Sequence, residues 1–538
     1  MKAGVCYYPE HWPETIWADD ARRMHETGIR VVRVGEFAWS RLEPQRGTFN
    51  FDWLDRAIDT LHQAGMEVVL GTPTATPPKW LIDEFPAILA VDENGNTRGF
   101  GSRRHYCFSS PEYRVECQRI VTAVASHFGQ HPAITAWQTD NEYGCHSTIA
   151  SYSPAAAQAF QHWCKSQYKT IDDLNRQWGN VFWSMEYRNF EEIPLPCGAV
   201  TELNPAHRLA FYRFSSAQVV SFNQLQVEIL RAHSPGRDIL HNYMGNFTEF
   251  DHHAVGRDLD IATWDNYPLG FLDRDSSNEA DKQKWYSTGH PDSSAFHHDL
   301  YRGVGNGRWW VIEQQPGPVN WAPHNPSPAP GMVRLWGWEA LAHGAEVMAW
   351  FRWRQAPFAQ EQMHSGLLLP NGDDDIAVAE IRQLMTEQAA LFEDINIPLP
   401  AAEQAPVAIV FDYNGDQALR IQSQGVNFDI GQWTQQLYTA CRRCGVNVDI
   451  VPVDADLSSY KLVILANTAI VTASLADSLQ HGSATIVIGP RCGSKTEDYC
   501  IPPELPPGAL QQLLPRRSFA QSVYATTNRG GRAASASM

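Results

Sequence analysis

Eight short runs of β-branched and aromatic residues, separated by longer segments of helical character, most constrain the fold of this chain. Segments 15–27 and 53–64 repeat apolar residues every three or four positions, and Gly28 and Gly65 close them. Regular alternation of strand and helix is typical of βαβ units around a parallel sheet. The sequence predicts strands at 4–8, 31–35, 67–71, 134–139, 239–243, 261–264, 309–313 and 346–350. Eight such strands indicate a (β/α)8 TIM barrel, which we place at residues 1–392.

Segments rich in Pro, Trp, Asn and Glu directly follow several of the predicted strands. They lie at residues 8–12, 72–78, 140–143, 265–268 and 313–317. A (β/α)8 barrel places its active site at the carboxyl ends of its strands. The polar and aromatic residues are therefore concentrated on the side expected of an enzyme.

A second domain is expected because 538 residues exceed the roughly 250 to 300 that one core supports. The strand and helix pattern restarts near residue 406, with runs at 407–411, 446–451, 462–465 and 485–489. We interpret residues 393–515 as a smaller doubly wound α/β domain. Residues 516–538 contain Ser, Ala, Arg, Gly and Thr with almost no large apolar side chains, so they predict a disordered tail.

Composition narrows the class of protein and its partners. The net charge of -18, with no local Lys/Arg cluster, disfavours nucleic acid as a partner. No apolar run approaches the roughly 20 residues of a membrane span, and the first residues do not resemble a secretory signal, so we expect a cytoplasmic protein without a membrane partner. The ten cysteines are then expected to be reduced thiols. The 19 Trp residues fit two interpretations: flat surfaces on which sugar rings stack, or side chains that fill the protein core.

Two glutamates, one after a predicted strand and one at the end of another, are candidates for cleaving a glycosidic bond. Such cleavage needs one carboxylic acid to protonate the leaving oxygen and a second carboxylate to attack, or to direct water at, the anomeric carbon. Glu142 and Glu313 would share one barrel mouth. A charge at the end of the buried run 309–312 is costly unless Glu313 is paired or functional. Asn141 could donate to a sugar hydroxyl, or the Asn-Glu pair could cap a helix.

Three longer motifs make the interpretation more specific. They are CYYPEHW at 6–12, TDNEYG at 139–144 and IEQQPG at 312–317. Over about residues 3–515 the sequence resembles the glycoside hydrolase family 42 β-galactosidases. The resemblance implies removal of terminal non-reducing β-D-galactose by a retaining double displacement, with Glu142 as acid/base and Glu313 as nucleophile. Their carboxyl groups should lie about 5 Å apart. No cofactor is implied.

The resemblance also implies which residues contact the galactose. They are Arg103, Asn141, Trp321, Glu361 and His364. Without it, Arg103 would be interpreted as a surface salt bridge, Trp321 as loop packing and His364 as an ordinary polar loop residue. The mechanism requires Glu142 to be protonated and Glu313 to be ionised when substrate binds. We therefore expect the two pKa values to differ, with the charge of Glu313 helping Glu142 to keep its proton.

A structural zinc bound by four cysteines occurs in some members of that family. Cys107 matches the first ligand, but Ser151, Ser153 and Ala156 stand where those members have cysteine. A lone thiolate cannot make a tetrahedral zinc site, and the nearby Cys145-His146 pair does not complete one. The sequence predicts no metal.

The second domain resembles the flavodoxin-like trimerisation domain of the family, which implies a homotrimer for the full-length enzymes. After residue 515 this chain departs from the family pattern and runs to Met538, as a truncated or frameshifted product would. Trimer formation and full activity are therefore open. Two alternatives also stay open: a related retaining glycosidase for β-fucosides, β-glucosides or α-L-arabinosides, or an inactive sugar-binding or assembly module.

Overall fold

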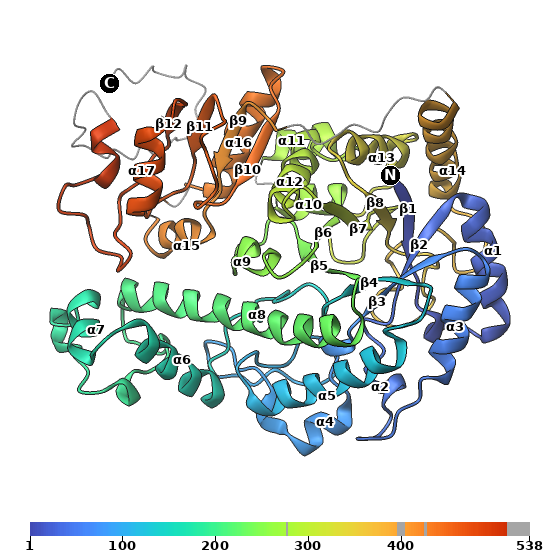
Figure 1. Ribbon diagram of the computed structural model, residues 1–538, viewed down its shortest axis with the longest axis horizontal. Helices are drawn as coiled ribbons and strands as arrows, with labels where there is room; N and C mark the ends of the chain where they lie inside the picture. The colour runs from blue at the N-terminus through green and yellow to red at the C-terminus, as the bar shows by residue number, and fades with distance from the viewer. Residues whose placement is uncertain (276–277, 395–403, 424, 426–427, 514–538) are drawn as a thin grey trace.

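A closed barrel of eight parallel strands forms the larger part of the molecule (Figure 1). The computed structural model describes residues 1–275, 278–394, 404–423, 425 and 428–513. The strands pair in chain order, and β1 closes the barrel against β8. They are β1 (Lys2–Cys6), β2 (Ile29–Val34), β3 (Glu67–Gly71), β4 (Ile134–Gln138), β5 (Asp238–Met244), β6 (Ile261–Asn266), β7 (Trp309–Gln314) and β8 (Val347–Trp350). Each overlaps a predicted run, so the barrel prediction is confirmed.

Helices surround the barrel and connect its strands. They are α1 (Trp17–Thr27), α2 (Trp39–Leu42), α3 (Asp52–Gln63), α4 (Lys79–Glu84), α5 (Pro111–Phe128), α6 (Pro154–Gln167), α7 (Ile171–Trp178), α8 (Pro205–His233), α9 (His252–Gly256), α10 (Pro268–Asp275), α11 (Glu279–Trp285), α12 (Pro291–Val304), α13 (Met332–Ala342) and α14 (Ile376–Ala389). Helices α1 and α3 are the two predicted from apolar spacing. Gly28 ends α1 at a φ of 96°, a left-handed conformation that glycine adopts without strain.

Shorter helical turns lie in the loops. They are η1 (Pro9–His11), η2 (Glu14–Ile16), η3 (Pro73–Ala75), η4 (Pro86–Ile88), η5 (Phe182–Ser184), η6 (Phe190–Glu192), η7 (Ala390–Asp394) and η8 (Gly508–Leu513). Two of them, η1 and η3, directly follow β1 and β3, where the sequence has its proline-rich segments. They contribute to the rim of the barrel mouth.

Apolar side chains fill the barrel interior below that mouth. They are Val31, Val69, Ala136, Leu240, Ile261, Trp310, Ile312, Val347 and Ala349. A β-bulge interrupts the regular alternation of side chains on β7. Trp264 on β6 pairs with Val311, but the next residue, Asp265, pairs with Glu313. The extra residue, Ile312, lets Glu313 lie beside Asp265, as bulges commonly redirect a side chain near an active site.

The second sheet is smaller and entirely parallel, in the order β10-β9-β11-β12. Its strands are β9 (Val407–Val410), β10 (Val448–Val451), β11 (Leu462–Leu465) and β12 (Thr485–Ile488), and its helices are α15 (Tyr413–Ile421), α16 (Ile430–Arg443) and α17 (Ala473–His481). In this order the second strand along the chain lies at one edge and the chain then crosses to the other side, which is the flavodoxin-like arrangement. The predicted second fold is confirmed.

The two sheets are joined by a polar contact between α12 and the second domain. Arg302 on α12 forms ion pairs with Asp299, at 2.5 Å, and with Asp449 on β10, at 2.9 Å. The division that we predict between residues 392 and 393 stays a prediction, and the predicted tail at 516–538 lies outside the described residues. Within the described part of the chain, no helix combines the length and apolar character needed to cross a bilayer.

Candidate active site

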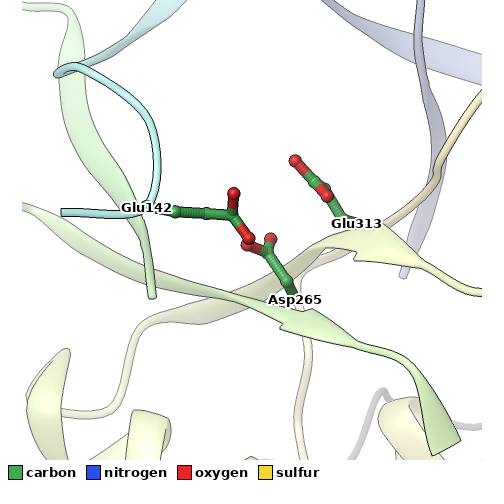
Figure 2. Close-up of side chains that lie close together, drawn as sticks. All are labelled: Glu142, Asp265 and Glu313. Atoms are coloured by element: carbon green, nitrogen blue, oxygen red, sulfur yellow. The ribbon is translucent and has the colours of Figure 1, made fainter. Parts of the chain in front are cut away.

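Three buried carboxyl groups meet at the mouth of the barrel (Figure 2). Glu142 follows β4, Asp265 lies near the end of β6 and Glu313 lies near the end of β7. One oxygen of each lies within 4.8 Å of the others. The structure thus brings together the two glutamates predicted from sequence. It adds Asp265, whose only signal in the sequence is its place at a strand end.

Two short hydrogen bonds hold the Glu313 carboxylate, and Nδ2 of Asn242 makes a longer one to Oε1 at 3.5 Å. Arg33 on β2 donates to Oε1 at 2.6 Å, and the Tyr267 hydroxyl donates to Oε2 at 2.5 Å. Arg33 is fully buried and also pairs with Glu36 at 3.0 Å. Burial raises the pKa of Glu313, although the positive charge of Arg33 opposes that rise. We expected a charge on Glu313 to be costly at the end of a buried strand, and the structure shows this carboxylate paired with Arg33.

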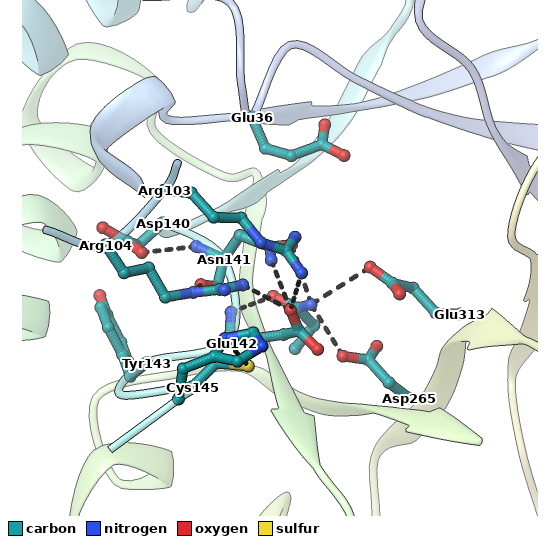
Figure 3. Close-up of polar contacts among 12 residues, drawn as sticks. Glu36, Arg103, Arg104, Asp140, Asn141, Glu142, Tyr143, Cys145, Asp265 and Glu313 are labelled. Carbon is teal, nitrogen blue, oxygen red and sulfur yellow. Dashed lines mark hydrogen bonds and ion pairs between the residues drawn. The ribbon is translucent and has the colours of Figure 1, made fainter. Parts of the chain in front are cut away.

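Glu142 lies in a tight turn directly after β4. Its φ is 45°, and its backbone N–H donates to Oδ1 of Asn242 at 3.0 Å. Oε2 accepts from Arg104 and from Nδ2 of Asn141, the latter at 3.0 Å, and lies 3.4 Å from Arg103 (Figure 3). The interpretation of Asn141 and Glu142 as a helix cap is wrong. The next helix, α6, starts at Pro154 and is capped by Ser153.

The pKa values of the two glutamates differ, but in the opposite sense to the expectation. Burial raises the pKa of Glu142, yet the guanidinium groups of Arg104 and Arg103 outweigh burial and hold the pKa at about 2. Without a sugar in the site, a single proton therefore favours Glu313 over Glu142. The sequence could not indicate this ordering, because Arg33 and Arg104 reach the two glutamates only in the folded barrel.

The predicted sugar-contact residues surround this pair. Arg103 lies over the ring of Phe37, at 5.5 Å from its centroid, in addition to its contact with Glu142. The rings of Trp321 and His364 each meet the Tyr267 ring edge-on at 5.6 Å. Glu361 pairs with Arg352 at 3.3 Å. All five predicted positions therefore lie around one mouth.

The structure does not support the purely structural roles considered for Trp321, His364 and Arg103. Trp321 packs against Tyr267, which holds the Glu313 carboxylate, so its packing is part of the site. His364 is only 2% exposed, and burial lowers the pKa of its imidazole to about 4 despite the nearby Glu361. It is therefore neutral at pH 7. Arg103 is 30% exposed at its side chain and contacts a buried carboxylate, so it is not a surface ion pair.

Asn242 on β5 connects the parts of the site, and sequence reasoning missed it. Its Oδ1 accepts from the Glu142 backbone and from Nε2 of Gln138, each at 3.0 Å. Its Nδ2 donates to Oδ1 of Asn141 at 3.0 Å and to Oδ2 of Asp265 at 2.9 Å, and lies 3.5 Å from Oε1 of Glu313. Also missed were Arg33, Arg104, Tyr267 and Asp265. Each is one polar residue in an otherwise ordinary strand or loop.

Cys107, the candidate zinc ligand, is buried. Its sulfur accepts a hydrogen bond from the hydroxyl of Ser153 at 3.3 Å. Ser153 also accepts from the backbone of Ala156, so its hydroxyl serves as the cap of α6. Cys145 lies 3.0 Å from the ring of His146, near Glu142. The absence of a metal stays a prediction.

Comparison with known protein families gives two matches along the chain. Residues 6–414 match the family model described as β-galactosidase. Residues 405–528 match the model described as the β-galactosidase trimerisation domain. Together they span the barrel from the last residue of β1 onward and the second sheet.

Individual proteins are similar over nearly the whole chain. A β-galactosidase from a Thermus species is 56% identical over 512 residues, which are 95% of this chain and 78% of that protein. A solved β-galactosidase from the psychrophilic Marinomonas ef1 is 55% identical with a TM-score of 0.94, covering 96% of this chain and 79% of the other. The solved enzyme from the haloarchaeon Halorubrum lacusprofundi is 43% identical with a TM-score of 0.92, covering 95% and 76%.

Proposed function

This chain belongs to the β-galactosidases of glycoside hydrolase family 42, and on that premise we propose that Glu142 is its acid/base and Glu313 its nucleophile. The observation that carries the proposal is the approach of the two carboxyl groups at the ends of β4 and β7. Their oxygens lie within 4.8 Å of each other. Retaining glycosidases need about 5 to 5.5 Å, whereas inverting enzymes leave roughly 6.5 to 9.5 Å for a water molecule. The short separation supports a retaining double displacement.

The contacts of Glu313 suit a nucleophile. In the first step an oxygen of Glu313 attacks the anomeric carbon and forms an ester as the bond to the leaving oxygen breaks. Arg33 and Tyr267 orient the carboxylate with hydrogen bonds of 2.6 and 2.5 Å. Arg33 also favours the ionised form of Glu313 against the effect of burial. The side chain is therefore oriented before substrate arrives.

Glu142 suits both proton transfers, provided that substrate changes its contacts. The free pair titrates as a unit, with one proton to share. A sugar that draws the guanidinium of Arg103 away from Glu142 weakens one of the positive charges that lower the pKa of that carboxyl, and it also excludes water. The proton then moves to Glu142, which passes it to the leaving oxygen. Once Glu313 is esterified, Glu142 accepts a proton from the attacking water.

Recognition of the galactose falls to Arg103, Asn141, Trp321, Glu361 and His364. Asn141 is held by Asn242, so one of its donors is available beside Glu142. Galactose and glucose differ in one hydroxyl configuration, and a site that bonds that hydroxyl can discriminate strongly. We assign this hydroxyl to buried, neutral His364 and to the Glu361 carboxylate, and the similarity to β-galactosidases supports β-D-galactosides over β-glucosides.

The trimerisation domain supports a homotrimer as the assembled state. Its sheet and helices are present through residue 513. Sedimentation velocity over a hundredfold concentration range tests this. A species of three chains is expected, and a monomer that still turns over substrate would contradict the need for assembly.

Hydrolysis of p-nitrophenyl glycosides tests the reaction and the roles together. We expect β-D-galactoside turnover well above that of the β-D-glucoside, β-D-fucoside or α-L-arabinoside. Glu313→Ala and Glu142→Ala should each lose at least about a thousandfold in turnover, as loss of a nucleophile or acid does. Glu26→Ala, at an exposed position on α1, is the matched control.

Azide separates the two roles. Azide should restore turnover to Glu142→Ala and give a β-galactosyl azide, because the ester still forms and azide needs no general base. Glu313→Ala should give the α-galactosyl azide, since azide then attacks the face that Glu313 has vacated. The opposite pairing of products would reverse the two assignments.

A further inference from the structure

Asp265 is a third carboxyl group at the reaction centre, and neither the sequence motifs nor the proposed mechanism gives it a role. Its side chain lies between those of Glu142 and Glu313, with one oxygen within 4.8 Å of each (Figure 2). The residue is only 1% exposed. At this distance, the charge of Asp265 affects the pKa values of both reacting carboxyl groups.

The arginines around the site are paired with carboxyl groups other than that of Asp265. Arg33 pairs with Glu36 and Glu313, and Arg103 and Arg104 pair with Glu142. Each of these three arginines is thus already paired with a glutamate. Among the described residues, no Lys, Arg or His nitrogen lies within ion-pairing distance of Asp265. An ionised Asp265, buried beside two other carboxyl groups and without a cation of its own, would be strongly unfavourable.

The hydrogen bonds of Asp265 lead to the same conclusion. Oδ2 accepts from Nδ2 of Asn242 at 2.9 Å, and Oδ1 is buried without a partner among the described residues. An ionised carboxylate normally accepts several hydrogen bonds, whereas a carboxylic acid accepts at its carbonyl oxygen and donates through its hydroxyl. With one accepted bond and no donor to Oδ1 in the described part of the chain, the ionised form of Asp265 is poorly stabilised, which favours the neutral acid.

We propose that Asp265 is a positioning residue that works as a neutral carboxylic acid, holding the Asn242 amide in place between the acid/base and the nucleophile. With its carbonyl oxygen bound to one hydrogen of Nδ2, the other hydrogen of Nδ2 points to Asn141. Oδ1 of Asn242 is then left to accept from the backbone of Glu142. The proton also prevents Asp265 from repelling the negative charge that Glu313 needs for attack. This inference rests on the proposed roles of Glu142 and Glu313.

The groups that face Asp265 come from several elements. They are Cys6 on β1, Arg33 on β2, Glu142 after β4, Asn242 on β5, Tyr267 after β6, Glu313 on β7 and Tyr301 on α12. Burial raises the pKa of Asp265 well above its usual value, Glu313 and Glu142 raise it further, and Arg33 opposes them. Cys6, Tyr267 and Tyr301 are buried with raised pKa values and stay neutral. Arg33 is thus the positive charge facing Asp265 in this set, and it is already shared by two glutamates.

Replacement of Asp265 by asparagine tests the protonation state. Asparagine resembles the neutral acid, with a carbonyl oxygen for Asn242 and an NH2 in place of the OH. We expect Asp265→Asn to keep at least about ten times the kcat/KM of Asp265→Ala and to leave both limbs of the pH profile in place. Asp265→Ala removes the acceptor and should lower kcat at least about tenfold. Asp260→Asn, at the opposite end of the barrel just before β6, controls for the loss of one aspartate.

An ionised Asp265 predicts a different result for the same variant. Removing a negative charge within 4.8 Å of two carboxyl groups would lower both of their pKa values, so both limbs of the profile would move to lower pH, by about one unit. That shift, or a loss of kcat/KM beyond tenfold in a folded Asp265→Asn protein, would overturn the proposal. A purely structural role would change the unfolding midpoint without favouring asparagine over alanine in turnover.

Infrared spectroscopy gives a readout that does not depend on turnover. The full-length chain, labelled with 13C at the aspartate carboxyl groups, should show the carbonyl stretch of a protonated aspartic acid at pH 8, and Asp265→Asn should lose that band. If the variant does not fold, the wild-type spectrum still tests the proposal, because absence of any such band at pH 8 contradicts a protonated Asp265. If the band is present but neither glutamate variant affects galactoside turnover, the proposed function fails while Asp265 is still shown to be neutral.

Discussion

Arg33 on β2 and Glu313 on β7 form an ion pair of 2.6 Å inside the barrel mouth, although 280 residues separate them in sequence. Arg33 is 0% exposed and also pairs with Glu36 at 3.0 Å. A single guanidinium therefore compensates two buried carboxylates. Its position explains how a nucleophile can stay charged where burial alone would favour its protonated form.

Replacing Arg33 with methionine should damage both stability and turnover. Loss of one partner leaves Glu36 and Glu313 buried without a counter-ion, which costs about 3 to 5 kcal/mol in the free energy of unfolding. We expect kcat/KM for a β-galactoside to fall at least about 100-fold, because Glu313 loses a donor and keeps its proton. Denaturant titration and initial rates measure the two effects. Arg302→Met, which breaks a buried pair with Asp299 on α12, should lower stability but not turnover.

Tyr267→Phe should slow the reaction without unfolding the protein. The hydroxyl donates to the Glu313 carboxylate at 2.5 Å, and a hydrogen bond to a charged group contributes about 1.5 to 3 kcal/mol. We expect kcat to fall about 10- to 100-fold. Tyr438→Phe is the matched control, since it removes a 2.5 Å hydrogen bond to Asp299 far from the reacting groups. Equal rates for the two variants would argue against Tyr267 as a support of the nucleophile.

Arg104→Gln should move the alkaline limb of the pH profile upward. Arg104 contacts Oε2 of Glu142 and, together with Arg103, holds the pKa of that carboxyl at about 2. Without the guanidinium, burial and the neighbouring Glu313 raise the pKa, so Glu142 keeps its proton to higher pH. The kcat/KM profile from pH 4 to 10 measures this limb. Arg176→Gln, at an exposed position on α7, should leave it unchanged. A downward shift in Arg104→Gln would contradict the assignment.

Stability should decline on acidification through about pH 6.5 to 4, and His297 on α12 is one source. Its Nδ1 donates to the Ser293 carbonyl at 2.8 Å and its Nε2 accepts from the Asn246 N–H at 2.9 Å, so the ring is neutral. Burial lowers its pKa from 6.5 to about 4. Below pH 6.5 the unfolded chain binds a proton that the folded chain does not, so the contribution of His297 is complete above pH 6.5. It is lost as the pH falls toward 4, by up to about 3 kcal/mol.

Denaturant midpoints at a series of pH values test this contribution. His297→Gln should unfold more easily at pH 7.5, because two buried hydrogen bonds are perturbed, but its midpoint should depend less on pH between 6.5 and 4. His481→Gln on α17, where the side chain is exposed, should keep the wild-type slope. An unchanged slope in His297→Gln would show that other buried groups account for the acid sensitivity.

The local pattern of apolar, β-branched and turn residues was sufficient to predict most of the fold. The eight barrel strands and the four strands of the second sheet are short runs bounded by turn residues, and apolar spacing marked α1 and α3. Such signals act within a few residues, so they can be read without knowing the rest of the structure. The bulge at Ile312 was not predicted, because it depends on the register between β6 and β7.

The site was predicted only in part, and for a related reason. Glu142 and Glu313 lie in long motifs after strands, so their types and positions could be read from the chain. Arg33, Asn242 and Tyr267 are single residues on different elements, and nothing local distinguishes them from other polar residues at strand ends. Their roles follow from contacts made across the barrel.

The sequence by itself determined that eight strands would close into a barrel and that two glutamates would face one mouth, because periodicity and strand order are properties of the chain. Only the tertiary structure decided the charge of each carboxyl group. Arg33 reaches Glu313, Arg104 reaches Glu142, and Asp265 has no cationic partner among the described residues. Protonation depends on burial and on charges a few ångströms away, and folding brings those charges together from distant parts of the sequence.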